Sequence, residues 1–215
     1  MELILEIQDE IKKKDLLKHP FYQDWMRGDL SQEQLQNYAL QYIPFTEAFP
    51  RFVSAIHSKC ISILGRKMLL ENLIEEEGYH SSKPHPHLWM NFLVGIGGDI
   101  NPETSYGFMA GELTKIFFRL CDASFEEGLC ALYVYESQIP KISELKVTGL
   151  KTHYNINSEK TLEFFNLHQE ADVYHSKSCE KLINNIEPQY QNKSKKSACI
   201  AAESLWEFLT EVYEN

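Results

Sequence analysis

Apolar residues recur at helical spacing along most of this chain, and no stretch alternates convincingly in the way that a strand would. Signals for helix ends frame the pattern. Ser31 with Gln34, and Ser124 with Glu127, are placed as capping boxes, and Gly78 follows a helical run. Because the period is that of a helix almost everywhere, the sequence predicts an all-α protein.

Prolines interrupt two of the longer helical patterns. Pro44, Pro50 and Pro140 are expected to bend the helices that contain them. The predicted helices cover residues 3–18, 31–60, 63–77, 87–96, 102–122, 125–150, 158–184 and 195–213. We therefore expect a bundle of about seven helices.

Length, charge and cysteine content narrow the class of protein. The 215 residues suffice for one sizeable core and contain no linker, so one domain over residues 1–215 is expected. The net charge of −10 argues against nucleic-acid binding, which needs a basic stripe. No apolar run approaches the ~20 residues that span a bilayer, and the N-terminus is unlike a signal peptide. Five cysteines without a C-x-x-C spacing predict buried thiols and a cytoplasmic location.

Polar residues share the apolar side of the predicted helix over 158–184. His168, Asp172 and His175 are spaced i, i+4 and i+7, which places them within an arc of about 60°. Phe165 lies in the same sector, which is expected to face the core. Burying two imidazoles and a carboxylate is costly unless they hydrogen-bond one another or bind a metal. The spacing alone leaves a polar network and a metal site as equal alternatives.

Two further carboxylates are expected to point inward. Glu136 shares its helix face with Leu129, and Glu76 continues a row of apolar residues that includes Leu73. A hydrogen bond from a tyrosine such as Tyr133 is the alternative explanation for a buried Glu136.

The loop after residue 78 carries His80, His85 and His87, each of which a surface position would explain. One of them would complete a set of three carboxylates and three imidazoles with Glu76, Glu136, His168, Asp172 and His175. Such a set without thiolates suits iron or manganese better than structural zinc, and six donors suit two ions bridged by a carboxylate. The ferritin pattern of two Glu-x-x-His motifs is not met, because only Glu77 with His80 has that spacing.

The order of these residues, Glu and His, then Glu, then His-x-x-x-Asp-x-x-His, resembles that of the haem-oxygenase-like dimetal oxidases. That family of helical bundles has relatives among the PqqC and TenA proteins, and within it the chain is most similar to the death-domain-associating (CADD) type. The similarity extends over residues 14–185 and is densest in "HPFYQDWMRGDLSQEQLQNYA", "AFPRFVSAIHSKC", "LLENLIEEEGY", "ALYVYESQIPKI" and "HQEADVYHS". These matches are long and irregular, and therefore specific.

The resemblance implies a centre of two metal ions, iron or iron with manganese, and dioxygen as co-substrate. By position, the implied ligands are Glu76, His85, Glu136, His168, Asp172 and His175. His85 is chosen because it lies four residues before Trp89, as the family's histidine lies before its tryptophan. His80 and His87 compete with it.

The resemblance also implies that the protein makes p-aminobenzoate, a folate precursor, from one of its own tyrosines, with a lysine supplying the amino group. The tyrosine corresponds to Tyr22 in "HPFYQDW" and the lysine to Lys146 in "ISELKVTGL". Tyr38 and Tyr135 are candidates for hydrogen bonds to the ligands or for electron relay. Without the resemblance, Tyr22 would be interpreted as an ordinary core aromatic and Lys146 as an ordinary surface lysine.

Three other functions remain open. A TenA-like hydrolase would use a cysteine nucleophile, for which Cys130 is the candidate, and no metal. A PqqC-like oxidase would also work without metal and would line its pocket with cationic residues. A partner-binding protein that acts on death domains is the third, although no sequence feature indicates such an interface. A homodimer is the expected assembly.

Overall fold

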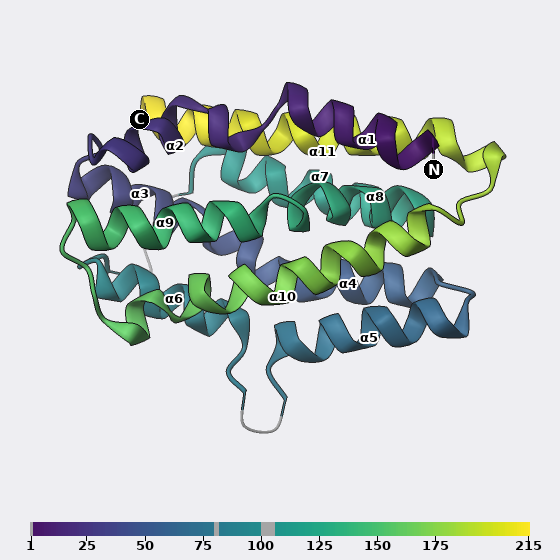
Figure 1. Cartoon of the computed structure of the whole chain (residues 1–215), viewed down its shortest axis with the longest axis horizontal. Helices are drawn as coiled ribbons and strands as arrows, with labels where there is room; N and C mark the ends of the chain where they lie inside the picture. The colour runs from purple at the N-terminus through teal and green to yellow at the C-terminus, as the bar shows by residue number, and fades with distance from the viewer. Residues whose placement is uncertain (1, 80–81, 100–105) are drawn as a thin grey trace.

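The structure is a computed structural model that describes residues 2–79, 82–99 and 106–215. Within these ranges it consists of helices and their connections, without strands, which confirms the all-α prediction. The helices follow one another along the chain as shown in Figure 1. They are α1 (Glu2–Lys13), η1 (Leu16–Lys18), α2 (Pro20–Arg27), α3 (Gln32–Gln41), α4 (Ile43–Lys59), α5 (Ile63–Glu77), α6 (His85–Gly95), α7 (Phe108–Ala123), α8 (Phe125–Glu136), α9 (Ile139–His153), α10 (Glu159–Ile183) and α11 (Pro188–Glu214).

The described residues contain eleven α-helices, so the prediction of about seven was too low. Prolines explain the difference. Pro44 and Pro140 do not bend one long helix but stand in the first turns of α4 and α9, where a missing N–H leaves no hydrogen bond unmade. Pro20 begins the short helix α2 in the same way, and this helix is absent from the predicted set. Of the prolines that the structure describes, only Pro50 lies in the interior of a helix, α4, which continues through it.

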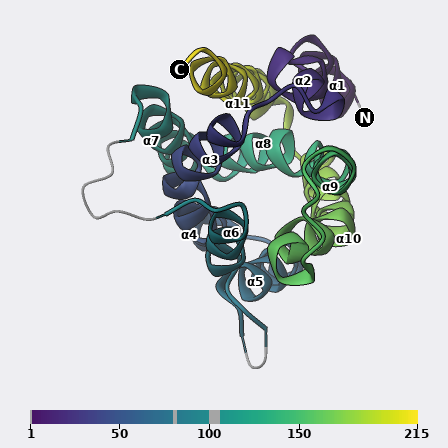
Figure 2. The ribbon, with the colours of Figure 1, turned by 90° about the vertical axis from the view of Figure 1, so that its left-hand side faces the viewer.

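The helices run along the long axis of the molecule in layers (Figure 1). Helices α1, α2 and α11 lie along one side, and α5 and α6 lie along the opposite side. Helix α10 packs against α9, α6, α8 and α5, so it has neighbours from several parts of the chain. Figure 2 shows α10 beside α9 and across from α4 and α6.

The core between these layers is rich in aromatic rings. Phe45, Phe52 and Phe117 pack edge to face or tilted, with ring centroids 4.9 to 5.6 Å apart. Four cysteines are buried, Cys199 is partly buried, and all five are unpaired, as the sequence predicts. Among the described helices, none is both long enough and apolar enough to cross a membrane.

Candidate metal centre

Helices α5, α6, α8 and α10 bring the carboxylates and histidines of the sequence pattern into the interior. The six residues are each at most 3% exposed. They are Glu76 at the end of α5, His85 at the start of α6, Glu136 at the end of α8, and His168, Asp172 and His175 on α10. Charged groups at such burial need partners, because water does not reach them.

Helix α10 supplies three of the six from one face. Its 25 residues contain neither glycine nor proline, so the helical period continues without a break through the site. His168, Asp172 and His175 are buried, whereas Glu170 and Lys177 on the other side of the helix are exposed. The orientation predicted from the spacing is therefore confirmed.

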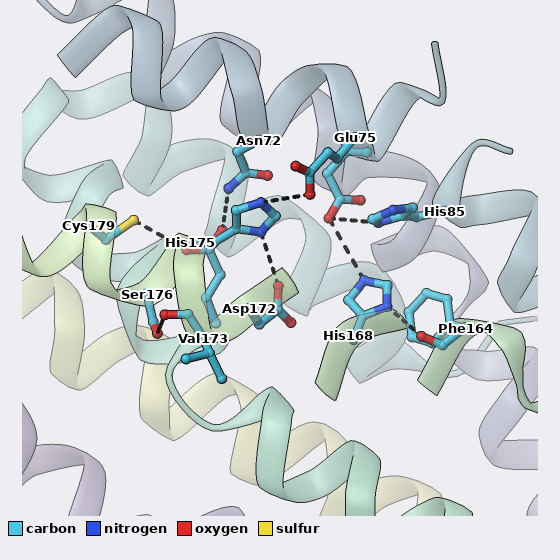
Figure 3. A network of polar contacts seen from close by, with 12 residues as sticks. Asn72, Glu75, His85, Phe164, His168, Asp172, Val173, His175, Ser176 and Cys179 are labelled. Carbon is cyan, nitrogen blue, oxygen red and sulfur yellow. Dashed lines mark hydrogen bonds and ion pairs between the residues drawn. The ribbon is translucent and has the colours of Figure 1, made fainter. Parts of the chain in front are cut away.

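Glu76, His85 and His168 form the tighter group. The Glu76 Oε1 atom lies 3.0 Å from His85 Nδ1 and 3.9 Å from His168 Nε2; Figure 3 shows the two histidine rings near each other. One ligand atom from each of the three residues lies within 4.8 Å of the others. Ligand atoms around one small cation lie about 3 to 4 Å apart when each bond is about 2.1 Å long. Small side-chain movements would bring this group to that spacing.

The second ring nitrogen of His168 fixes which atom faces Glu76. His168 Nδ1 lies 2.6 Å from the backbone oxygen of Phe164, which accepts a hydrogen bond only from a protonated nitrogen. In the neutral ring the lone pair is therefore on Nε2, the atom directed at Glu76. A backbone carbonyl commonly orients metal-binding histidines in this way.

Glu136, Asp172 and His175 form a looser group. His175 Nδ1 lies 3.3 Å from Asp172 Oδ1. The Glu136 carboxylate accepts hydrogen bonds from Asn72 Nδ2 at 2.7 Å and from the Cys179 thiol at 3.2 Å. In the part of the chain that the structure describes, these three do not form a set as tight as the first group.

Several buried polar atoms in both groups lack a hydrogen-bond partner among the described residues. They are His85 Nδ1, Asp172 Oδ2 and His175 Nε2; the two ring nitrogens lie 3.0 and 3.1 Å from carboxylate oxygens of Glu76 and Glu75, but without hydrogen-bond geometry. An unsatisfied buried polar atom typically costs about 1–3 kcal/mol, so native structures rarely retain three of them together. Cations would satisfy these atoms, and a donor set of three carboxylates and three imidazoles suits iron or manganese. The residues present therefore fit a metal centre.

The pKa values in the metal-free protein differ between the groups. Burial acts to raise the pKa of Glu76, but His85 and His168 outweigh it and lower that pKa to about 2. Burial raises the pKa of Glu136 to about 7. For His175, burial acts to lower the pKa, but Asp172 and the nearby carboxylates outweigh it and raise that pKa to about 9. The looser group therefore holds protons near neutral pH that a cation must displace.

Lys146 and two tyrosines form a polar cluster beside the metal centre. Lys146 is 4% exposed, so the alternative of a surface lysine is wrong. Its Nζ atom donates a hydrogen bond to the Tyr38 hydroxyl at 2.5 Å, and that hydroxyl lies 3.3 Å from the hydroxyl of Tyr22. Burial lowers the pKa of Lys146 well below its ordinary value, which favours the neutral and nucleophilic amine.

A small cavity lies beside this cluster. It has a volume of about 20 Å³, and Tyr22, Tyr38, Tyr135 and Lys146 are among its lining residues. Phe164 also lines it, and the Phe164 ring stacks on the His168 ring at a centroid distance of 4.0 Å. The structure thus brings the four residues singled out for catalysis to one cavity, and Phe164 contacts both this cavity and the His168 ring of the candidate metal centre.

The alternative ligand His87 and the alternative nucleophile Cys130 are not supported by their positions. His87 is exposed, and His80 falls outside the described residues. Cys130 is fully buried, and burial raises the pKa of its thiol to about 12. An activated cysteine needs a lowered pKa, so this environment argues against Cys130 as a hydrolase nucleophile.

Three residues near the site were not predicted. Glu75 Oε2 lies 3.1 Å from His175 Nε2, while Asn72 and Cys179 bind Glu136. Helical spacing offered a signal for two of them, because Asn72 precedes Glu76 by four residues and Cys179 follows His175 by four. No such signal distinguishes Glu75 from an ordinary surface glutamate.

Comparison with known proteins agrees with this geometry. The family described as "Iron-containing redox enzyme" matches residues 36–206. The 4-aminobenzoate synthase of Chlamydia trachomatis serovar D is 35% identical over 97% of this chain and 93% of its own length. The 4-aminobenzoate synthase of Nitrosomonas europaea is 35% identical over 98% of this chain and 90% of its own length.

Solved structures share the fold at lower sequence identity. A TenA homologue from Pseudomonas syringae pv. tomato superposes with a TM-score of 0.82 at 16% identity, covering 100% of this chain and 92% of its own. A CADD-like protein of unknown function from Nostoc punctiforme gives a TM-score of 0.69 at 20% identity, covering 98% and 97%. A Shewanella denitrificans domain with a haem-oxygenase-like fold gives 0.80 at 12% identity, covering 96% and 90%. The chain therefore has the haem-oxygenase-like fold and belongs to the family of iron-containing redox enzymes.

Proposed function

We propose that the protein makes 4-aminobenzoate, also called p-aminobenzoate, and that its own Tyr22 is the source of the aromatic ring. The relatives named 4-aminobenzoate synthase support this, since they align over nearly the whole of the chain. The observation that carries the proposal is the buried cluster of Tyr22, Tyr38 and Lys146 beside the six-donor centre.

The proposed ligands are the two groups of side chains that the helices bring together. Glu76, His85 and His168 hold one ion, and Glu136, Asp172 and His175 hold the other. The ions are iron, or iron with manganese. When bound and reduced, they supply electrons for the reduction of the co-substrate dioxygen.

Lys146 is the proposed source of the amino group. Burial lowers the pKa of its amine well below the ordinary value, which favours the neutral form, whose lone pair can attack an oxidised ring. The Tyr38 hydroxyl lies between this amine and the hydroxyl of Tyr22, at 2.5 and 3.3 Å. Protons lost by Tyr22 and Lys146 therefore have a hydrogen-bonded path through Tyr38.

The size of the cavity favours an internal substrate. Its volume of about 20 Å³ is enough for one molecule of the size of water or dioxygen. An aromatic acid does not fit there, whereas the Tyr22 ring already forms part of the wall. Tyr135 lines the same cavity and is proposed to relay an electron or a proton to the reacting ring.

A single-turnover experiment tests the proposal. Reduced, iron-loaded protein is mixed with oxygen, and 4-aminobenzoate is measured together with the mass of the peptide that contains residue 22. We expect at most one product molecule per chain and a mass loss on that peptide. Many product molecules per chain, with an unchanged peptide, would show that the substrate comes from outside.

Four expectations about the wider context stay predictions. They are the organisation of residues 1–215 as one domain, a cytoplasmic location, a homodimer and a death-domain protein as partner. Sedimentation measures the assembly, and a pull-down with a purified death domain measures the partner.

A further inference from the structure

A surface pocket lies directly beside the candidate metal centre. It has a volume of about 280 Å³ and opens between the end of α5, the start of α6 and the middle of α10. Glu75, Lys83, His85 and Glu163 are among its lining residues. The His85 side chain is only 4% exposed, yet it forms part of the wall. The pocket therefore leads from the solvent to one of the proposed ligands.

Glu75 connects this pocket with a second proposed ligand. Its side chain is 48% exposed, and its Oε2 atom lies 3.1 Å from Nε2 of His175, whose side chain is 1% exposed (Figure 3). The contact has the length of an ion pair, which forms when the His175 ring is protonated, although its geometry is not that of a hydrogen bond. Two ligand atoms of one cation lie at about this separation.

The charges around the pocket favour a cation. Lys83 Nζ lies 2.7 and 2.8 Å from the two carboxylate oxygens of Glu163, so these two charges offset each other. Glu75 has no lysine or arginine partner among the described residues, where its ion-pair contact is with the His175 ring alone. Its negative charge at the mouth of a concave site raises the local concentration of cations.

The pocket is also large enough for a hydrated ion. Six waters occupy about 180 Å³ at about 30 Å³ each. The pocket has a volume of about 280 Å³, so a divalent cation can arrive with its water shell and lose it there.

We propose that this pocket is the route by which metal ions reach the centre, and that Glu75 binds the incoming ion and passes it to His175. Glu75 would hold the incoming ion at the mouth of the pocket, and His175 Nε2, 3.1 Å away, would hold it next, in front of Asp172. The inference rests on the proposed function, because it requires a metal centre behind the pocket.

The rate of iron loading distinguishes the role of Glu75 from that of its neighbour Glu77. Metal-free protein is mixed with iron(II) without oxygen, samples are stopped with a chelator at set times, and bound iron is measured after desalting. We expect Glu75→Gln to load at least about tenfold more slowly than the parent, because the carboxylate that attracts the ion is lost. Glu77→Gln removes the same charge from an exposed position two residues away and should load at the parental rate.

The final iron content distinguishes a transfer residue from a permanent ligand. At saturation we expect Glu75→Gln to hold as much iron as the parent. An unchanged loading rate in Glu75→Gln, or a loss of iron at saturation, would overturn the role in uptake. A parent protein that binds no iron at any time would instead overturn the proposed function, and this inference with it.

Lys83 provides an independent test at the same pocket. Lys83→Met leaves Glu163 without its partner and makes the mouth more negative, so loading should become faster. Added salt should slow the parent and should slow Glu75→Gln less, because screening acts on the charge that this variant lacks. Loading of Lys83→Met at or below the parental rate contradicts the proposed route.

Discussion

At the scale of single residues, the Lys146 amine lies in surroundings unlike those of an ordinary lysine. Its Nζ atom is 4.6 to 5.7 Å from the ring centroids of five aromatic residues. They are Tyr22, Trp25, Tyr38, Trp89 and Phe165. Burial disfavours the charged amine and lowers its pKa well below the ordinary value, whereas the faces of the rings attract a cation and oppose this shift.

This burial reduces stability, and Lys146→Met should reveal the size of the effect. The folded pKa lies below the unfolded value of about 10.5, so the unfolded chain binds a proton that the folded chain rejects. Below pH 10.5 this difference favours unfolding. We expect Lys146→Met to raise the free energy of unfolding at pH 7 by about 1 kcal/mol or more. The gain should shrink as the pH approaches 10.5.

Urea unfolding of the metal-free protein between pH 7 and pH 10 measures this effect. Lys141→Met is the matched control, because Lys141 lies on the same helix and is exposed. A gain for Lys146→Met that is the same at every pH would mean that the amine stays charged in the folded protein.

Tyr22→Phe tests the role of the proposed substrate. The change removes one buried hydroxyl, which lies 3.3 Å from Tyr38, and should lower stability by about 1–3 kcal/mol at most. Iron content should be unchanged, because Tyr22 belongs to neither group of proposed ligands. Formation of 4-aminobenzoate should stop, as measured by mass spectrometry of the reaction mixture.

Tyr133→Phe is the control for that experiment. Tyr133 is also buried and also loses a hydrogen bond, from Gln8, but it does not line the cavity. It should make product as the parent does. If Tyr22→Phe also makes product at the parental level, Tyr22 is only a packed aromatic.

At the scale of the helices, α10 carries half of the proposed ligands. All three lie on its buried face, and the opposite face is exposed to solvent. Asp172→Ala removes a carboxylate from the buried face and should weaken iron binding by more than about 100-fold, since even partners of ligands contribute 10- to 100-fold. Glu170→Ala removes a carboxylate from the exposed face and should leave iron binding unchanged. The iron content of each variant after dialysis against a chelator measures both effects. If Asp172→Ala retains as much iron as the parent, Asp172 is not a ligand.

The site on α10 was predictable because its residues lie on one helix with an unbroken period. Their convergence with Glu76, His85 and Glu136 does not follow from spacing, since it depends on how four helices pack; only the family resemblance indicated it. The helix ends at Pro44 and Pro140 were misjudged because a proline in a first turn and a proline at a bend look alike in sequence.

The burial of Lys146 could not be predicted from helical spacing for a similar reason. On α9 it looks like a surface lysine, but α2 approaches α9 closely on that side. The Trp25 indole N–H donates to the backbone oxygen of Lys146 at 3.3 Å, and a Cβ atom at Gly149 would lie 2.7 Å from the Trp25 ring. The contact with α2, together with rings from α3, α6 and α10, buries the amine, and this packing leaves no pattern in the sequence of α9 alone.

At the scale of the whole molecule, metal binding should exchange protons with the solvent. In the metal-free protein the pKa of His175 is raised to about 9 and that of Glu136 to about 7, so both bind protons below these values. An ion must displace those protons, and the apparent affinity for iron(II) should therefore rise with pH from 6 to 9. Calorimetric titrations in buffers with different heats of ionisation measure the protons released. Affinity that does not change over this range would mean that neither group becomes a ligand.

The small volume of the cavity favours Tyr22 as the source of the ring, and this has a consequence for the cell that makes the protein. If the ring comes from Tyr22, each molecule of product consumes one chain of 215 residues and 25.0 kDa. The chain is then a reagent rather than a catalyst, and the rate of supply equals the rate of its translation. Transcription and ribosome output would set how much 4-aminobenzoate is available, and spent chains would have to be cleared by proteolysis at the same pace.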